Sequence, residues 1–103
     1  MKFYELMLII NGELTQEDAD AEFEKFIKVV EDGNGKILNI DKWGLKRFAY
    51  PIKKKNNGYY YVVRLGVDYQ LLKELERLFR INENLFRYLF VKLDSRKIEL
   101  KEE

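Results

Sequence analysis

Apolar side chains recur along this chain at two different spacings, and each spacing predicts one kind of secondary structure. Residues 3–10 form a short apolar run that Asn11 and Gly12 end, which indicates a β-strand. Two later segments carry apolar residues three and four positions apart, the spacing of one helix face: Phe23, Phe26, Ile27 and Val30 in the first, and Leu71, Leu72, Leu75, Leu78 and Phe79 in the second. We therefore predict helices near residues 15–32 and 68–80.

Polar residues at the ends of both apolar stripes support these helix boundaries. Thr15 precedes Asp18 by three residues, a spacing that resembles a capping box with Asp in place of the usual Glu. Asp68 can cap the second helix with its side chain. Residues 32–35, Asp-Gly-Asn-Gly, are expected to stop the first helix, with Gly supplying the left-handed conformation that ends many helices.

The segments between and after the predicted helices are typical of strands. Residues 36–52 are expected to be extended, and residues 53–58 to form a charged turn, because Asn57-Gly58 is a strong hairpin signal. Aromatic and β-branched residues then indicate a strand over residues 59–67. The last strand is predicted over residues 85–93.

The predicted order is strand, helix, strand, strand, helix, strand (βαββαβ). This order indicates an α+β fold of the ferredoxin-like, split βαβ class, in which a four-stranded antiparallel sheet carries both helices on one face. A chain of 103 residues fits one domain. We assign residues 1–93 to this domain and residues 94–103, which are rich in charge, to a flexible C-terminal tail.

One face of the predicted sheet is left uncovered, and the alternation of side chains along each strand identifies its residues. Glu5 marks the outward set in the first strand, and Arg64 marks it in the third. The outward set is mostly apolar: Phe3, Met7, Ile9, Tyr60, Val62, Leu89 and Val91. An exposed apolar patch of this kind usually marks a macromolecular interface. The alternative is that segment 36–52 or the tail covers part of it.

The composition narrows the chemistry that is available to this chain. It contains no Cys and no His, which removes disulfides, thiol nucleophiles and the commonest neutral-pH base and metal ligand. No cofactor, metal site or small-molecule substrate is therefore expected. Fully apolar runs reach only five residues, far short of a membrane span, and no signal-peptide pattern is present. The expected location is the cytoplasm.

Charge is unevenly distributed although the net charge is only +1. Residues 1–35 carry three Lys or Arg against nine Asp or Glu, a balance of −6. Residues 36–64 carry eight Lys or Arg against one Asp, a balance of +7. A basic middle segment on a nearly neutral chain indicates a localised contact with a polyanion, and the alternative is a solubilising charged hairpin.

A nine-residue run in the middle of the chain carries a family resemblance: Gly44-Leu45-Lys46-Arg47-Phe48-Ala49-Tyr50-Pro51-Ile52. Together with the following Lys53 and Gly58-Tyr59, it resembles the signature of the bacterial small-subunit ribosomal protein six family. Tyr4-Glu5 and Arg80-Ile81-Asn82-Glu83-Asn84 also fit, so the resemblance spans essentially the whole chain. It implies the fold derived above and a structural, non-enzymatic role in the small ribosomal subunit.

The resemblance also implies partners and contact residues. Members of the family bind the central domain of 16S rRNA together with small-subunit ribosomal protein eighteen, with which they form a heterodimer. RNA contact is implied for Lys2, Tyr4, Lys46, Arg47, Tyr50, Arg80, Arg87 and Lys92. Of these, Lys46, Arg47 and Tyr50 could serve partner docking instead. The outward face predicts partner contact for Phe3, Met7, Tyr60, Val62, Arg64 and Leu89.

The low net charge predicts how such an assembly would form. We expect the isolated chain to be a monomer with weak RNA affinity, because a charge of +1 supplies little long-range attraction. A partner on the outward face is expected to orient Lys2, Arg87 and Lys92 together and to add phosphate contacts of its own.

Several of these residues have a second interpretation. Lys46 and Arg47 can also keep an exposed edge strand from pairing with other sheets. Trp43 and Tyr50 can stack on bases or pack on protein, and we expect base stacking by neither, because Trp is more often buried. Residues 53–55, three lysines, are interpreted as a solvated turn.

Three other functions suit the same architecture less well. The RNA recognition motif needs outward aromatic residues, whereas alternation points Tyr59 and Tyr61 inward. An acylphosphatase-like enzyme needs an Arg in a phosphate-cradling loop after the first strand, where this chain has Asn11-Gly12-Glu13. A protein-only interaction module is the third alternative, and a measurement of RNA binding would separate it from an RNA-binding function.

Overall fold

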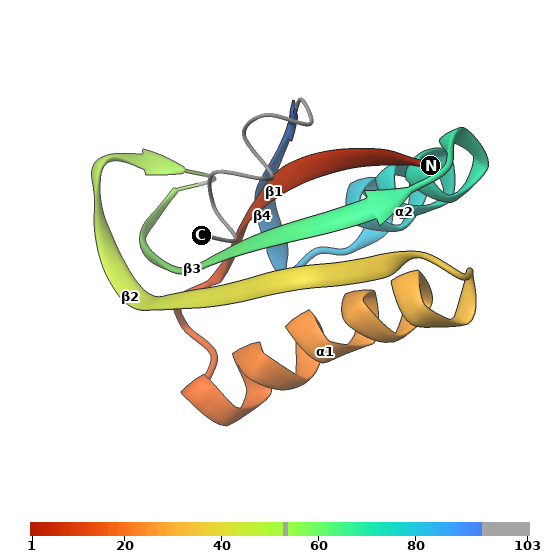
Figure 1. Cartoon of the computed structure of the whole chain (residues 1–103). Coiled ribbons are helices and arrows are strands. Elements are labelled where there is room, and N and C mark those ends of the chain that lie inside the picture. Colours follow the sequence, from red (N-terminus) through yellow and green to blue (C-terminus); the bar gives the residue numbers. More distant parts are fainter. Residues whose placement is uncertain (53, 94–103) are drawn as a thin grey trace.

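The four strands form one antiparallel sheet in the spatial order β2-β3-β1-β4. The computed structural model describes residues 1–52 and 54–93. Its elements are β1 (Lys2–Asn11), α1 (Gln16–Asp32), β2 (Lys36–Ile52), β3 (Lys55–Val67), α2 (Tyr69–Ile81) and β4 (Leu85–Lys92). This confirms the predicted βαββαβ order, while the predicted tail, residues 94–103, lies outside the described residues. In Figure 1, α1 runs alongside β2, and α2 lies near the N-terminus.

Both helices pack on the same face of the sheet. The ring of Phe23 in α1 stacks on Tyr61 of β3 with 4.4 Å between ring centroids. Phe79 of α2 lies 5.0 Å from Tyr88 of β4, and 4.8 Å from Phe26, so it also joins the two helices. The buried inward residues of the strands complete this core: Leu6, Leu8, Ile10, Tyr59, Val63 and Leu65. The predicted division into inward and outward residues is therefore confirmed.

The predicted N-terminal caps are present, but the end of α1 differs from the prediction. The Thr15 hydroxyl accepts a hydrogen bond from the Asp18 N–H at 3.2 Å, and the Asp68 carboxylate accepts one from the Leu71 N–H at 2.8 Å. Asn34, with φ of 64°, takes the left-handed conformation that was expected of Gly. Gly33 has φ of −87°; a Cβ there would come 2.7 Å from Leu71 Cδ1, so Gly33 serves close packing instead.

The predicted hairpin between residues 36–52 and the next strand is present, but its turn does not lie at Asn57-Gly58. Ile52 pairs with Lys55, so the chain reverses between these two residues. Asn57 instead pairs with Arg47 inside the ladder. The turn uses Lys54, whose φ of 63° is the left-handed conformation that tight hairpins require. Strand β3 therefore begins at Lys55, four residues before the predicted start at Tyr59.

Gly58 lies inside β3 because two other side chains approach its backbone closely. A Cβ at this position would come within 2.6 Å of both Ile9 Cγ2 and Phe48 Cζ. Phe48 belongs to the far end of β2, where residues 48–51 have no pairing partner on β3. Its ring lies 6.2 Å from that of Tyr60, on the uncovered side of the sheet. The end of β2 therefore folds back toward the face that the helices leave open.

A carboxylate of α1 ties the helix to the loop before β4. Glu22 accepts hydrogen bonds from Asn82 Nδ2 at 3.2 Å and Asn84 Nδ2 at 3.4 Å, and Lys25 Nζ lies 3.4 Å away. Asn84 in turn accepts a hydrogen bond from Asn11 Nδ2 at 3.3 Å, at the end of β1. Burial opposes ionisation of Glu22, but the hydrogen bond from Asn82, the charge of Lys25 and the bond from Asn84 outweigh it. The pKa of Glu22 therefore lies below its ordinary value of 4.5.

We predict that Glu22→Ala lowers the free energy of unfolding at pH 7 by about 1–3 kcal/mol, the usual cost of losing hydrogen bonds to a charged group. Because the folded-state pKa is depressed, this stabilisation is complete above the unfolded-state pKa, near 4.5, and is lost as pH falls through the lower folded-state value. Urea denaturation across pH 3–7 measures it. Glu24→Ala is the control, since within residues 1–52 and 54–93 Glu24 makes one ion pair, an exposed one at 3.9 Å with Lys42. Equal losses in both variants would contradict the structural role of Glu22.

Candidate RNA and protein interface

The outward side chains of the sheet form rows that cross all four strands. Cross-strand pairing places three rows side by side: Asp41, Val62, Met7 and Leu89; Asn39, Arg64, Glu5 and Val91; Gly44, Tyr60, Ile9 and Arg87. We name the apolar part of this surface the open face; its residues are Phe3, Met7, Tyr60, Val62, Leu89 and Val91. Leu89 and Val91 are 57% and 44% exposed. The predicted outward set therefore forms one contiguous surface.

Ile9 differs from the other outward residues because it is buried. Its Cγ2 and the Phe48 ring both approach Gly58, and only 7% of Ile9 is exposed. The end of β2 therefore shields one corner of the sheet. The expectation that segment 36–52 covers part of the apolar surface is confirmed for this corner, whereas the same expectation for the tail falls on residues outside the described ranges.

One ion pair lies in the middle of the open face. Arg64 Nε donates to Glu5 Oε2 at 3.1 Å, and these two residues are direct cross-strand partners. Their side chains are 20% and 36% exposed, so both are partly shielded by the apolar residues around them. Within residues 1–52 and 54–93, Glu5 is the one group that binds the Arg64 side chain. The remaining guanidinium N–H groups can therefore donate to an acceptor on a partner.

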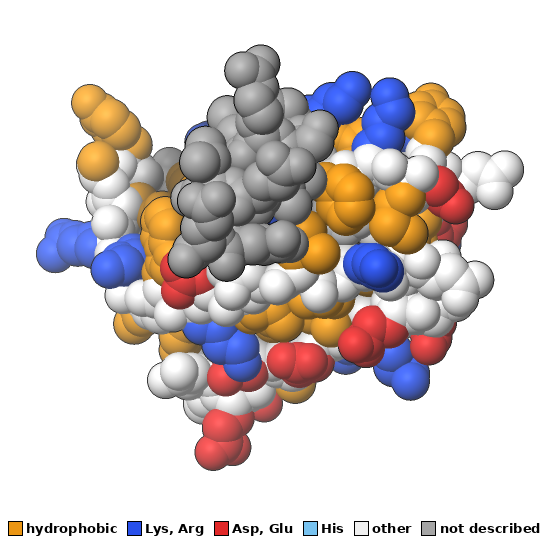
Figure 2. Space-filling model, in the orientation of Figure 1, with side chains coloured by type: hydrophobic (Ala, Val, Ile, Leu, Met, Phe, Trp, Pro, Cys, Tyr) orange, Lys and Arg blue, Asp and Glu red, His pale blue; other side chains and the backbone are white. Residues whose placement is uncertain are grey.

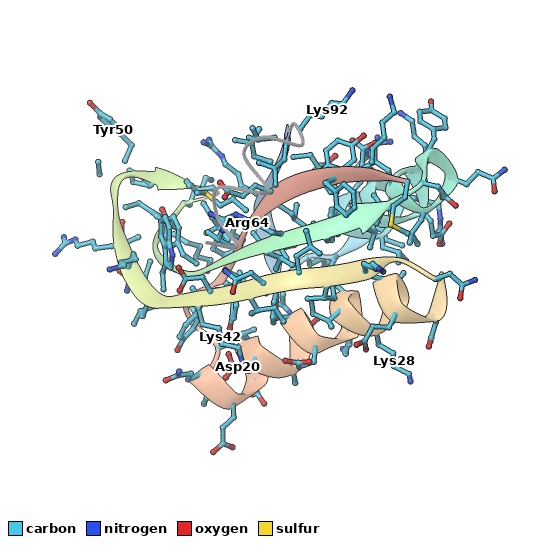
Figure 3. The ribbon with its side chains drawn as sticks, viewed as in Figure 1. Asp20, Lys28, Lys42, Tyr50, Arg64 and Lys92 are labelled. Atoms are coloured by element: carbon cyan, nitrogen blue, oxygen red, sulfur yellow. The ribbon has the colours of Figure 1, made fainter. Side chains whose placement is uncertain are left out.

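A shallow groove of about 280 Å³ lies where the end of β2 comes over the sheet. It is lined by Arg47, Phe48, Ala49, Tyr50, Pro51, Ile52, Tyr60 and Arg87, and we name it the arginine groove. It brings together three of the predicted RNA-contact residues, although Arg47 and Tyr50 are far from Arg87 in the sequence. Figure 3 shows Tyr50 projecting away from the rest of the molecule at the end of β2.

A second group of predicted RNA-contact residues lies along β4 on the side of the sheet that carries the helices. Tyr4 is the cross-strand partner of Lys92, and its ring lies edge-on to Phe90 at 5.8 Å. The neighbouring ammonium group of Lys2 lowers the pKa of Lys92, which indicates that the two charges lie close together. Arg80 lies at the end of α2, where the Tyr88 hydroxyl beside it raises the pKa of its guanidinium. We name Lys2, Tyr4, Arg80 and Lys92 the basic edge.

The predicted RNA contacts thus fall into two groups on opposite faces of the sheet. Arg87 lies on the same face of the sheet as Leu89, which is the uncovered face. Lys92 lies on the same face as Phe90, which is the face that carries the helices. The structure therefore does not bring Arg87 together with Lys2 and Lys92. Lys46 stays exposed near the arginine groove, opposite Gly58 in the β2–β3 ladder.

Helix α1 is the acidic part of the molecule. Figure 2 shows Asp and Glu side chains gathered over it, at the bottom of the view. Lys42 of β2 lies 3.7 Å from Asp20 and 3.9 Å from Glu24, so its charge is neutralised there (Figure 3). The hydroxyl of Tyr61 donates to Asp20 at 2.6 Å, and burial together with this bond raises the pKa of Tyr61. The acidic side chains of α1 therefore repel a polyanion from this side of the protein.

Neither a membrane span nor a metal cluster occurs in the described part of the chain. No helix there is long and apolar enough to cross a membrane. Residues 1–52 and 54–93 also contain no cluster of three or more acidic groups that could hold a metal ion. In the loop that an acylphosphatase-like site would need, Asn11 Oδ1 accepts a hydrogen bond from the Glu13 N–H at 2.9 Å and so shapes the turn.

Comparison with known protein families identifies the family of this chain. A family model described as "Ribosomal protein S6" matches residues 3–92. The chain belongs to the ribosomal protein S6 family. Membership makes it a structural, non-enzymatic constituent of the small ribosomal subunit, which works in the cytoplasm, as the sequence resemblance implied.

Relatives and a solved structure of the S6 family agree with this assignment. The small ribosomal subunit protein bS6 of Clostridium acetobutylicum is 40% identical over 95 residues, which cover 92% of this chain and all of that protein. The bS6 protein of Clostridium kluyveri is 44% identical over 89 residues, covering 86% of this chain and 94% of the relative. The crystal structure of 30S ribosomal protein S6 from Thermotoga maritima matches with a TM-score of 0.86 and 33% identity, covering 98% of this chain and 94% of that one.

The structure gives roles to signature residues that the sequence did not explain. Asn82 and Asn84 of the S6-family motif before β4 bind Glu22, so their amides hold the loop against α1. Phe48 and Gly58 form the contact that turns the end of β2 toward the open face. Glu22 carried no sequence signal of its own, because its partners lie about 60 positions away along the chain.

We predict that Lys2→Ala raises the pKa of the Lys92 ammonium toward its ordinary value of 10.5, because the substitution removes the neighbouring like charge. NMR titration of the lysine side chains measures this pKa directly. Lys28→Ala is the control, since Lys28 is an exposed lysine on α1, away from Lys92 (Figure 3). An unchanged Lys92 pKa in the Lys2→Ala variant would show that the two ammonium groups are not neighbours in solution.

Proposed function

We propose that this S6-family chain binds the central domain of 16S rRNA together with small-subunit ribosomal protein eighteen, and that it docks this protein on the open face. The observation that carries the proposal is the contiguous open face, flanked by the arginine groove at one end and by the basic edge along β4. Burial of these apolar residues against a partner is favourable by about 25 cal/mol per Å² of apolar area removed from water. The basic groups remain available for phosphate.

The composition of the open face favours a protein over RNA as its direct partner. The row that contains Val62, Met7 and Leu89 offers apolar contacts but no hydrogen-bond donor from a side chain. The core of a protein interface is apolar, whereas nucleic-acid contacts need donors for phosphate oxygens. The ion pair between Glu5 and Arg64 adds a polar feature that a partner must match, and such features contribute to specificity.

The basic edge is the surface on which we place the main RNA contact. Lys2 and Lys92 hold two positive charges close together, and their mutual repulsion is relieved when a phosphate group lies between them. Tyr4 lies beside them as the cross-strand partner of Lys92 and can donate its hydroxyl to the same backbone. Arg80 extends the surface at the end of α2.

The charge distribution explains why RNA binding should depend on the partner. The net charge is only +1, and the negative charges of α1 offset the attraction that the positive charges of the basic edge exert on RNA. The isolated chain, which we expect to be a monomer, therefore has few phosphate contacts to offer. A partner on the open face supplies more contacts and fixes the orientation of the complex on RNA, which is positive cooperativity.

We predict that Leu89→Asp weakens binding of protein eighteen at least about tenfold, because it places a charge among the apolar residues of the open face. Isothermal titration calorimetry without RNA measures the affinity. Ile81→Asp is the matched control: Ile81 is also an exposed aliphatic residue, at 66%, but lies on α2 outside the open face. Equal weakening by both substitutions, or by neither, would argue against docking on this face.

We also predict that the pair of proteins binds a central-domain rRNA fragment more tightly than either protein does alone. Filter binding with this chain, with protein eighteen and with both measures the three affinities. Each phosphate contact adds about 0.7–0.9 to the slope of log K against log salt, so the pair should also show the steeper slope. Two outcomes contradict the proposal: this chain binds RNA as tightly by itself, or the pair does not bind at all, which would favour the protein-only alternative.

A further inference from the structure

We propose that the arginine groove holds one unpaired nucleotide of the bound RNA, with its phosphate on Arg47 and Arg87 and its base stacked on Tyr50. This inference rests on the proposed function and adds a second RNA contact to it, on the opposite face of the sheet from the basic edge. It also revises the expectation from the sequence that Tyr50 does not stack on a base.

The shape of the groove follows from an irregular end of β2. Pairing with β3 is interrupted between Arg47 and Ile52, so residues 48–51 lie outside the ladder. The backbone N–H groups of three of these four residues are not used in the ladder, and Pro51 has none. Backbone N–H groups that line a concave surface are good donors for phosphate oxygens.

The charge of the groove selects an anion. Its lining contains two arginines and no Asp or Glu. Neither Arg47 nor Arg87 has an ion-pair partner within residues 1–52 and 54–93. Guanidinium groups bind phosphate through paired, parallel N–H donors, so two of them on one groove suit a single phosphodiester well.

Tyr50 has the exposure that base stacking requires. The residue is 83% exposed, and Figure 3 shows it projecting into solvent. The other aromatic residues of this region already pack on another ring, since the ring centroids of Trp43 and Phe48 each lie 6.2 Å from that of Tyr60. Within the described part of the chain, Tyr50 has no ring against it. Single-stranded bases stack on such exposed rings, whereas paired bases are held within a helix.

The size of the groove suits one nucleotide. Its volume of about 280 Å³ is at the lower limit of small-molecule sites, which start at about 300 Å³. An acidic side chain of a protein partner would satisfy only the arginines, whereas a nucleotide offers a phosphate for the arginines and a base for the Tyr50 ring within one group. The combination of two arginines with one free aromatic ring therefore favours a nucleotide.

The test compares the affinity of three variants, each assembled with protein eighteen, for the central-domain rRNA fragment. Tyr50→Ala should weaken binding at least about fivefold, the lower end of the effect of losing one base stack. Tyr50→Phe, which keeps the ring, should bind like the original chain. Tyr69→Ala is the matched control and should have no effect, since Tyr69 is a 70% exposed tyrosine at the start of α2.

Three results would overturn the inference. Tyr50→Ala could bind RNA normally, or Tyr50→Phe could be as weak as Tyr50→Ala, which would exclude stacking. The third result is that Tyr50→Ala weakens binding of protein eighteen in the absence of RNA, which would make the groove a protein site. A variant with Lys2→Ala and Lys92→Ala separates this inference from the proposed function. If that variant loses RNA affinity while Tyr50→Ala does not, only the nucleotide site is wrong; if neither loses affinity, RNA binding by this chain is wrong as well.

Discussion

Ten consecutive cross-strand pairs join β1 to β3, from Lys2 with Val67 to Asn11 with Gly58, and their register decides what each face of the sheet presents. Successive side chains on a strand point to opposite faces, so a shift of one residue would exchange the two faces completely. The observed register places Tyr61 and Val63 under the helices, where they are buried, and Tyr60 and Val62 on the open face. The register of β1 against β3 therefore determines both which residues form the core and which form the open face.

The same alternation separates the charges that could meet RNA. Arg87 and Lys92 are only five positions apart on β4, yet they belong to opposite faces. A ligand that contacts both must therefore wrap around the edge strand. In the proposed complex, RNA would contact both sides of the edge strand, while the protein partner would cover the apolar surface beside the arginine groove. The sheet would then lie between the protein partner and part of the RNA.

The sequence predicted those features that depend on neighbours along the chain. Both helix stripes, the caps at Thr15 and Asp68 and the outward set of strand residues follow from local spacing, and the structure confirms them. Features that depend on distant contacts could not be predicted. Gly58 resembled a turn residue because nothing local shows that Phe48 packs on it. The arginine groove exists only because that contact brings the end of β2 to Arg87, and the low exposure of Ile9 has the same origin.

We propose that one face of this sheet binds a protein while the helix-covered side does not. The most direct measurement is NMR titration of the ¹⁵N-labelled chain with protein eighteen in the absence of RNA. We expect the amide signals of the strands to change most, above all those of Met7, Val62 and Leu89, while the signals of the exposed residues of α1 keep their positions. Changes concentrated on α1, or on the basic edge without the open face, would contradict it.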